Sequence, residues 1–202
     1  GPLLEQNFIK ELIGPCSGNT YMSSKDYNRY MKTKDMKIYN KAVEKIRKYY
    51  EIMSYRTFLG RVLGHKMKSE DGKVLKDNKG FDRREIPVNR IQFLENTIIM
   101  VDEAHNLTGN DEGNALLKLL RNKKTKNVKV LLMTATPMKN VVTDIAMLYS
   151  FLNPHNPLDF KRMFDLGGRN AEVVLKKGWQ EYFTKQIEGK VSYVRGADPM
   201  LY

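Results

Sequence analysis

The chain has 202 residues, 41% hydrophobic and 29% charged, which is the balance of a soluble globular protein with one core and an appended element. Its net charge of +12 favours a polyanionic partner such as nucleic acid, with a merely basic surface or an acidic protein partner as alternatives. No signal peptide and no apolar run of roughly 20 residues is visible, so we expect an intracellular protein with no membrane partner. The single cysteine, Cys16, excludes an intrachain disulfide, and the scattered histidines disfavour a zinc site.

The first part of the chain is predicted to be helical. Apolar residues recur at helical spacing over residues 3–13, and Gly14-Pro15 ends this helix. Residues 24–49 predict two further helices with a break near Thr33. Their lysines and arginines alternate with tyrosines, a pattern that suits a phosphate backbone. We favour the alternative, a solvated face whose tyrosines pack on the core.

The next segment changes character several times. Residues 50–55 predict a strand, and residues 56–63 a short helix that Gly64 ends. Residues 66–84 are rich in charge and glycine, which indicates a surface loop or hairpin with little core. Residues 87–95 predict a short helix that leads into the following strand.

The strand at residues 97–101 organises the rest of the chain. Its continuous apolar run is typical of a parallel strand that is covered on both faces. Asp102 and Glu103 follow it directly, at the end of the strand where ligands bind in open α/β sheets. The two acids therefore indicate a metal–phosphate site. Taken alone, a helix cap formed by Asp102 has equal weight.

A parallel sheet is predicted around this strand. A helix over residues 112–121 and a second strong strand over residues 128–133 follow it, and a helix over residues 141–152 comes next. The alternation of strands and helices indicates right-handed crossovers. The fold class is therefore α/β.

The tail differs from this alternating pattern. Helical stretches are predicted over residues 159–164 and 171–187, and a strand over residues 190–194. We therefore divide the chain into residues 1–155 and a mainly helical extension over residues 156–202.

Two short motifs together resemble those of a known family. Asp102-Glu103-Ala104-His105 ends one predicted strand, and Thr134-Ala135-Thr136-Pro137 ends the next. They resemble motifs II and III of superfamily 2 helicases and translocases, in the right order and with one helix between them. Two such matches at strand ends are a strong signal, whereas a four-residue match alone would be weak.

The resemblance extends along most of the chain. Residues 2–11 resemble motif Ia of the Swi/Snf-type branch, and residues 54–58 resemble its Ser/Thr-Tyr strand end beside the bound nucleic acid. Residues 190–199 resemble the segment that leads into the second RecA-like lobe. These residues and 138–140 are most similar to helicases of large DNA viruses, including the poxvirus-type early transcription NTPases.

The resemblance implies roles for particular residues, and the chemistry of the side chains agrees with them. Asp102 suits Mg²⁺ held through a water molecule, and Glu103 lies at the metal and activates the attacking water. His105 is implied to couple hydrolysis to movement. The same coupling role is implied for Thr134, Ala135 and Thr136. For the two threonines, helix capping is the alternative. The implied nucleic-acid contacts are Pro2, Asn7, Ser54, Tyr55 and Arg56.

One expected part is missing from the sequence. A nucleotide site of this kind needs a phosphate loop, Gly-x-x-x-x-Gly-Lys-Ser/Thr, and residues 60–66 approach this pattern only with the wrong spacing. In the family that loop precedes motif Ia. We therefore expect an internal portion of a larger helicase: an incomplete RecA-like parallel sheet without the phosphate-loop strand, in residues 1–155, and the connection toward the second lobe.

The resulting functional hypothesis is an ATP-dependent helicase or translocase that uses ATP and Mg²⁺ in the intact protein. Its expected partners are nucleic acid, with DNA favoured over RNA, the second RecA-like lobe and transcription machinery. The expected location is the host cytoplasm or the virion. The isolated chain is expected to be inactive. The alternative is a non-catalytic basic nucleic-acid-binding module, while a nuclease or phosphatase would need acids at the other strand ends.

Overall fold

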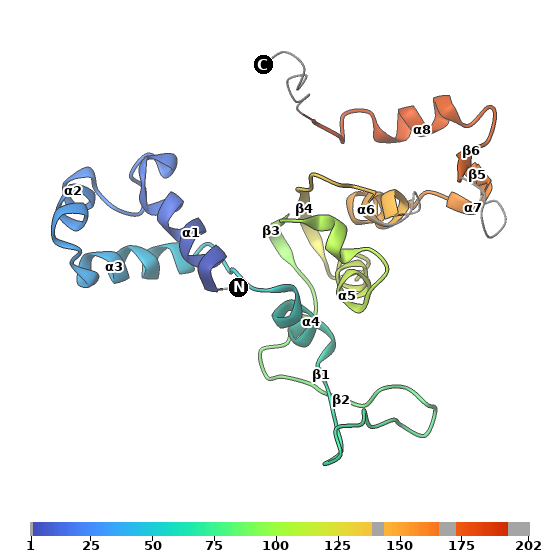
Figure 1. Cartoon of the computed structure of the whole chain (residues 1–202), viewed down its shortest axis with the longest axis horizontal. Helices are drawn as coiled ribbons and strands as arrows, with labels where there is room; N and C mark the ends of the chain where they lie inside the picture. The colour runs from blue at the N-terminus through green and yellow to red at the C-terminus, as the bar shows by residue number, and fades with distance from the viewer. Residues whose placement is uncertain (1, 139–143, 166–172, 194–202) are drawn as a thin grey trace, which may run out of the picture. The chain divides into compact units, whose positions relative to one another are not determined.

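The computed structural model describes residues 2–138, 144–165 and 173–193, and the chain forms two compact units (Figure 1). The N-terminal unit comprises residues 1–58 and the C-terminal unit residues 59–202, and each is described by itself. The division predicted near residue 155 concerns the lobes of a longer protein and stays a prediction. Of the helices in the described ranges, none has both the length and the hydropathy required to cross a bilayer.

The N-terminal unit is helical, as predicted. It contains α1 (Pro2–Ile13), the short 3-10 helix η1 (Pro15–Ser17), α2 (Ser24–Thr33) and α3 (Met36–Arg47). Ser23 caps α2 by accepting a hydrogen bond from the backbone N–H of Asp26. Asp35 caps α3 in the same way, and Lys34 between the two helices adopts a left-handed conformation. These two caps explain the predicted break near Thr33.

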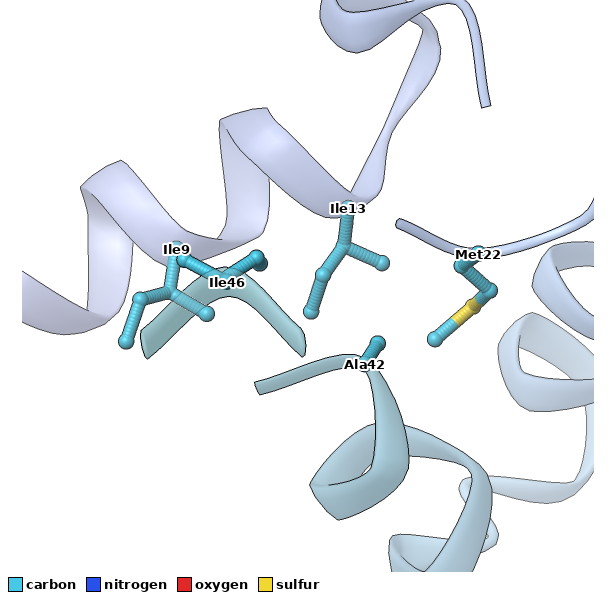
Figure 2. Packing of buried hydrophobic residues seen from close by; sticks show 5 residues of the cluster. All are labelled: Ile9, Ile13, Met22, Ala42 and Ile46. Carbon is cyan, nitrogen blue, oxygen red and sulfur yellow. The ribbon is translucent and has the colours of Figure 1, made fainter. Parts of the chain in front are cut away.

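A small apolar core holds the N-terminal unit together. Figure 2 shows its side chains, which come from α1, the following loop and α3: Ile9, Ile13, Met22, Ala42 and Ile46. The tyrosines that alternate with the basic residues pack against this core: Tyr27, Tyr30, Tyr39 and Tyr50. Tyr49 is the exception, since its side chain is 79% exposed. The favoured interpretation, tyrosines on the core and cations toward solvent, is confirmed for these four.

The strand predicted over residues 50–55 is wrong. Residues 50–54 are irregular, and α4 (Tyr55–Leu63) begins directly after them. The physical reason is a local cap: the Ser54 hydroxyl accepts a hydrogen bond from the Thr57 backbone N–H at 3.2 Å, which starts the helix at Tyr55. The predicted end of this helix at Gly64 is confirmed.

The charged segment after α4 forms the predicted hairpin. Strand β1 (His65–Lys66) pairs antiparallel with β2 (Arg84–Glu85), and two isolated bridges between them, Lys68 with Val74 and Lys76 with Asp82, each close a turn of their own. The helix predicted over residues 87–95 is wrong, because this segment instead serves the last carbonyl groups of α4. The Ile91 backbone N–H binds the Arg61 carbonyl at 2.8 Å, and the Arg90 side chain binds the Val62 carbonyl at 3.1 Å.

The centre of the C-terminal unit is a parallel pair of strands, as predicted. Strands β3 (Glu95–Val101) and β4 (Lys126–Leu132) are joined by α5 (Asp111–Leu120), and α6 (Asp144–Leu152) contacts both α5 and β4. Residues 141–143 of the predicted last helix lie outside the described residues. The buried apolar residues of this layer come mainly from η2 (Ala104–Leu107), α5 and α6.

We predicted that both faces of β3 are buried, and for the described residues this prediction is wrong. Val101 is buried, but the side chains of Ile98 and Met100 are 66% and 47% exposed. Side chains alternate between the two faces of a strand, and the layer of α5 and α6 covers one of them. An apolar run shows that both faces can be covered, not that this chain covers them.

The tail matches its prediction in part. Helix α7 (Phe160–Met163) confirms the first helical stretch. Of the second, residues 171–172 lie outside the described part, and the rest becomes β6 (Val174–Leu175), which pairs with β5 (Phe164–Asp165), followed by α8 (Gln180–Ile187). The helix starts late because residues 174–175 pair as a strand and Gly178 turns the chain at a φ of +88°. The strand predicted over 190–194 is wrong for residues 190–193, which are irregular, and residue 194 lies outside the described part.

Candidate functional site

The two predicted motifs lie side by side because β3 and β4 are parallel neighbours in register. Val101 lies opposite Leu132 at the ends of the strands. Two hydrogen bonds continue the pairing beyond them: the Met133 N–H binds the Val101 carbonyl at 2.8 Å, and the Ala104 N–H binds the Met133 carbonyl at 2.9 Å. The segment after β3 is thereby held against the segment after β4.

One ring nitrogen of His105 lies at the centre of this junction. Its Nδ1 lies 2.8 Å from Thr134 Oγ1, 3.2 Å from Thr136 Oγ1 and 3.4 Å from a carboxylate oxygen of Glu103. The His105 side chain is only 10% exposed, whereas that of Glu103 is 55% exposed. The Thr136 N–H also binds Thr134 Oγ1 at 3.1 Å, which closes the turn after β4. Two hydroxyl groups and a carboxylate therefore share one ring nitrogen.

The two acids occupy different backbone positions at the end of β3. Asp102 accepts a hydrogen bond from the Glu103 N–H on its own Oδ1, at 3.0 Å. Glu103 occupies the N-cap position of η2 with a left-handed φ of +50°, and its side chain makes no capping hydrogen bond. A non-glycine residue in this conformation costs on the order of 1–3 kcal/mol and is frequent at functional sites. Helix capping by Asp102 was the competing interpretation, and the N-cap position belongs to its neighbour.

Helix α5 packs against η2, the short helix that follows the two acids. A β-carbon added at Gly113 would collide with the backbone carbonyl of Leu107, so the start of α5 and the end of η2 touch through their backbones. Asn110 caps α5 by accepting a hydrogen bond from the Gly113 N–H at 3.0 Å. The Thr108 hydroxyl binds the His105 carbonyl at 2.8 Å. The loop that carries the acids is thus held by packing as well as by hydrogen bonds.

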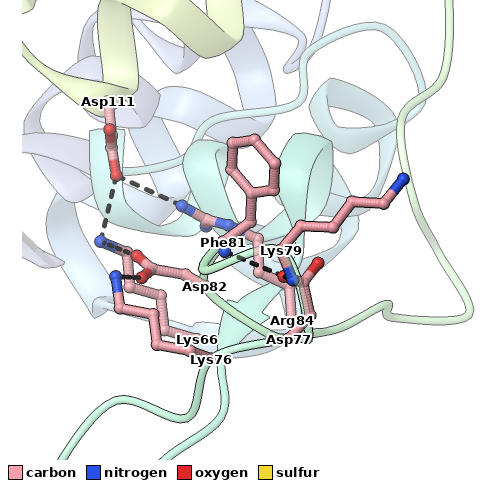
Figure 3. A network of polar contacts seen from close by, with 8 residues as sticks. All are labelled: Lys66, Lys76, Asp77, Lys79, Phe81, Asp82, Arg84 and Asp111. Atoms are coloured by element: carbon pink, nitrogen blue, oxygen red, sulfur yellow. Dashed lines mark hydrogen bonds and ion pairs between the residues drawn. The ribbon is translucent and has the colours of Figure 1, made fainter.

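The sequence interpretation missed an ion-pair network that ties the hairpin to α5 (Figure 3). Asp111, in the first turn of α5, pairs with Lys66 at 3.4 Å and with Arg84 at 3.2 Å. Asp82 pairs with Lys66 at 2.9 Å and with Lys76 at 2.7 Å. Hydrogen bonds from these two lysines lower the pKa of Asp82 to about 2. Only the mixed charges of the segment signalled such pairing in advance.

The predicted nucleic-acid contacts belong to the N-terminal unit. Asn7 is exposed on α1, which Pro2 begins, and Arg56 is exposed in the first turn of α4 beside the half-buried Tyr55. Ser54 lies just before α4 as its cap. The structure brings the motif II residues 102–105 and the motif III residues 134–137 together. The predicted nucleic-acid contacts are described only within the N-terminal unit. Ala135, the remaining predicted coupling residue, is exposed in the turn after β4.

The comparison with protein families decides the class of this chain. Residues 50–167 match the SNF2-related domain. The chain belongs to this family. The family has a RecA-like α/β fold, with which the parallel strands and flanking helices agree. The resemblance to the Swi/Snf-type branch and to helicases of large DNA viruses is confirmed.

Three similar proteins come from viruses. The chain is 37% identical over its full length to a protein of Acanthamoeba polyphaga mimivirus that is named an ATP-dependent RNA helicase. It is 26% identical, over 96% of its length, to a protein of Invertebrate iridescent virus 3 that is named a helicase. Over 56% of its length it is 25% identical to the early transcription factor 70 kDa subunit of vaccinia virus (strain Ankara). The chain spans only 18%, 16% and 17% of these three relatives. No solved structure matches it.

The donor set of the site fits a hard divalent cation that retains part of its water shell. Among the described residues, no group of three or more histidine, cysteine, aspartate or glutamate side chains gathers as a metal cage. Mg²⁺ in phosphate-transfer sites takes one or two carboxylates and completes its coordination with water and phosphate oxygens. Asp102 and Glu103, both exposed at the end of β3, supply that number of carboxylates.

Proposed function

We propose that this chain is part of an ATP-dependent nucleic-acid helicase or translocase that works in viral transcription or genome handling. The observation that carries the proposal is the convergence of Glu103, Thr134 and Thr136 on Nδ1 of His105, at the ends of two parallel strands. A lobe that only binds nucleic acid has no need for two acids beside such a junction. Membership of the SNF2-related family and the names of the viral relatives support the same reading.

In the proposed mechanism, Asp102 and Glu103 have separate tasks. Asp102 would hold Mg²⁺ through a water molecule, and the bound ion would supply positive charge against the phosphates of ATP. Glu103 orients the attacking water and accepts its proton, which requires the carboxylate to be ionised. The exposure of Glu103 leaves that carboxylate accessible to water.

Coupling to movement is assigned to the residues around His105. The imidazole lies between the Glu103 carboxylate and the threonine hydroxyls of the turn after β4. A shift of that turn therefore changes the hydrogen bonds of the imidazole, and with them the environment of Glu103. Ala135 belongs to the same turn and moves with the two threonines.

The proposal extends to partners and location. Nucleic acid, with DNA favoured over RNA, would contact Pro2, Asn7, Ser54, Tyr55 and Arg56, and the second RecA-like lobe of the same protein would complete the nucleotide site. The relationship to an early transcription factor subunit supports transcription machinery as a further partner. The protein would act inside the cell, in the host cytoplasm or the virion.

The test is ATP hydrolysis by the intact protein, with DNA or RNA added in separate reactions. Glu103→Gln keeps the shape of the side chain but removes the base, and we expect kcat to fall by about 10²–10⁴. Binding of ATP should persist, because the variant removes no phosphate contact. Unchanged hydrolysis in Glu103→Gln would contradict the mechanism, and salt-dependent binding without hydrolysis by the unmodified intact protein would favour the non-catalytic module.

A further inference from the structure

A row of lysines follows one side of α3 and its C-terminal end. Lys37, Lys41, Lys45 and Lys48 are spaced by four, four and three residues, so they lie on one helical face, and all four are exposed. At a rise of 1.5 Å per residue, this lysine stripe is about 16 Å long. Its charges follow one another at intervals of about 5–6 Å.

The charges of the lysine stripe are available to a ligand. Within the described residues, none of the four lysines is in ion-pair contact with an acid. The neighbouring arginines differ, because Arg47 pairs with Glu5 at 3.3 Å and Arg29 pairs with Asp35 at 3.9 Å. Glu44 is the one acid within α3, and it lies at the edge of the stripe.

The face opposite the lysine stripe anchors the helix. Ala42 and Ile46 are buried in the core of the N-terminal unit, and Tyr39 packs against it and stacks on Tyr30. The stripe is therefore carried by a helix whose other side is fixed (Figure 2). Among the tyrosines of residues 24–49 only Tyr49, next to Lys48, is exposed. The stripe therefore offers no row of rings on which successive unpaired bases can stack, unlike proteins that bind single strands.

We propose that the lysine stripe binds the phosphate backbone of a nucleic-acid duplex, independently of base sequence. A duplex presents phosphates outward and keeps its bases stacked, which matches a surface with regular cations and no stacking platform. The stripe precedes residues 50–167, where the SNF2-related domain matches, so this is a surface additional to the site at the ends of β3 and β4. The inference rests on the proposed function only in naming nucleic acid as the partner.

The test measures binding of the 202-residue chain to a labelled DNA duplex by fluorescence anisotropy, without nucleotide and over a range of salt concentrations. The stripe variant replaces all four lysines by glutamine. Each lost phosphate contact lowers the magnitude of the slope of log K against log salt by about 0.9, so for four lysines we expect a slope smaller by up to about 3.6 and an affinity lower by about tenfold or more.

A matched variant controls for net charge. It carries glutamine at four exposed lysines of the C-terminal unit that also have no ion-pair contact within the described residues: Lys118, Lys123, Lys126 and Lys129. Both variants lose the same charge, so equal losses of affinity would overturn the proposal. Replacing the stripe by four arginines should preserve duplex binding, and loss of binding in this folded variant would also overturn it.

Two further measurements sharpen the result. Glu44→Gln removes the acid beside the stripe and should raise duplex affinity about twofold or more, with a contribution that salt screens. A single strand of the same length should be bound more weakly than the duplex, and tighter binding of the single strand would contradict the proposal. Because the duplex-binding measurement contains no nucleotide and involves no hydrolysis, failure of the hydrolysis mechanism and failure of the stripe remain distinguishable.

Discussion

At the scale of single residues, the proposed coupling depends on one nitrogen atom. Nδ1 of His105 has two hydroxyl neighbours, and the shorter contact is to Thr134 at 2.8 Å. Thr134 is half-buried, while Thr136 is exposed and 3.2 Å away. A partly buried hydrogen bond is stronger than an exposed one, because water competes less for it. The two threonines should therefore contribute unequally.

Thr134→Val removes the nearer hydroxyl and leaves a side chain of similar shape. We expect the number of nucleotides traversed per ATP hydrolysed to fall in the intact protein, while hydrolysis without nucleic acid changes little. The lost hydrogen bond corresponds to about 0.5–1.5 kcal/mol. Thr136→Val, the matched control, should have a smaller effect on the same ratio. An equal loss of basal hydrolysis in Thr134→Val would place this hydroxyl in the chemical step instead.

At the scale of elements, replacing Gly113 at the junction of η2 and α5 by alanine would have two opposing effects on stability. Alanine in place of glycine inside a helix usually stabilises it by about 0.8–1.0 kcal/mol. At Gly113 the added methyl group meets the backbone carbonyl of Leu107, which cannot move aside like the end of a flexible side chain. Overpacking of this kind costs about 1–3 kcal/mol, so the clash should win.

Gly113→Ala should therefore lower the free energy of unfolding by up to about 2 kcal/mol, measured by urea denaturation. Gly109→Ala is an informative comparison, because its φ is +71° but no atom lies within 4 Å of the added carbon. That variant should show only the cost of the backbone conformation, about 1 kcal/mol. A more stable Gly113→Ala variant would refute the proposed close contact.

The hairpin network should depend on acidic pH. The pKa of Asp82 is lowered from 3.8 to about 2 by its hydrogen bonds with Lys66 and Lys76. A lowered pKa means that the ionised carboxylate stabilises the folded state above its ordinary pKa, and that this contribution disappears as the pH falls from about 4 to about 2. The hairpin should loosen over that range.

Asp82→Asn tests this directly. The difference in thermal stability between the unmodified chain and the variant should be constant above about pH 4 and should shrink toward pH 2. Glu70→Gln removes a charge from the same hairpin at an exposed position without these lysine contacts. The difference in thermal stability between the unmodified chain and this variant should therefore stay small at every pH. A gap of unchanged size at low pH would show that Asp82 does not act through its charge.

At the scale of the whole molecule, the site in these 202 residues contains the acids but no Gly-x-x-x-x-Gly-Lys-Ser/Thr sequence. Phosphate release by the purified chain, with nucleic acid present, should therefore be indistinguishable from background. The same chain should still bind duplex through the lysine stripe. Measurable stimulated turnover that Glu103→Gln abolishes would disprove this prediction.

Local patterns in the sequence were sufficient for much of this protein. Helical periodicity predicted α1, α2, α3 and α5, because this signal acts over three or four neighbouring residues. The two strand ends could be paired in advance, since parallel neighbours bring their carboxyl ends to the same edge. For this reason the neighbourhood of Asp102, Glu103 and Thr134 was foreseeable, whereas their roles stay predictions.

Other features depend on contacts between segments that are distant in the sequence, and local sequence patterns do not report such contacts. Residues 87–95 lost their predicted helix because Arg61 and Val62 needed hydrogen-bond partners at the end of α4. The exposed face of β3 carries apolar residues, as a face covered by helices would. Only the packing of the neighbouring elements shows which face is exposed. The convergence of three side chains on one nitrogen of His105 is likewise set by backbone register and packing. Composition and spacing place these residue types at the ends of two strands, and the folded chain determines which atoms meet.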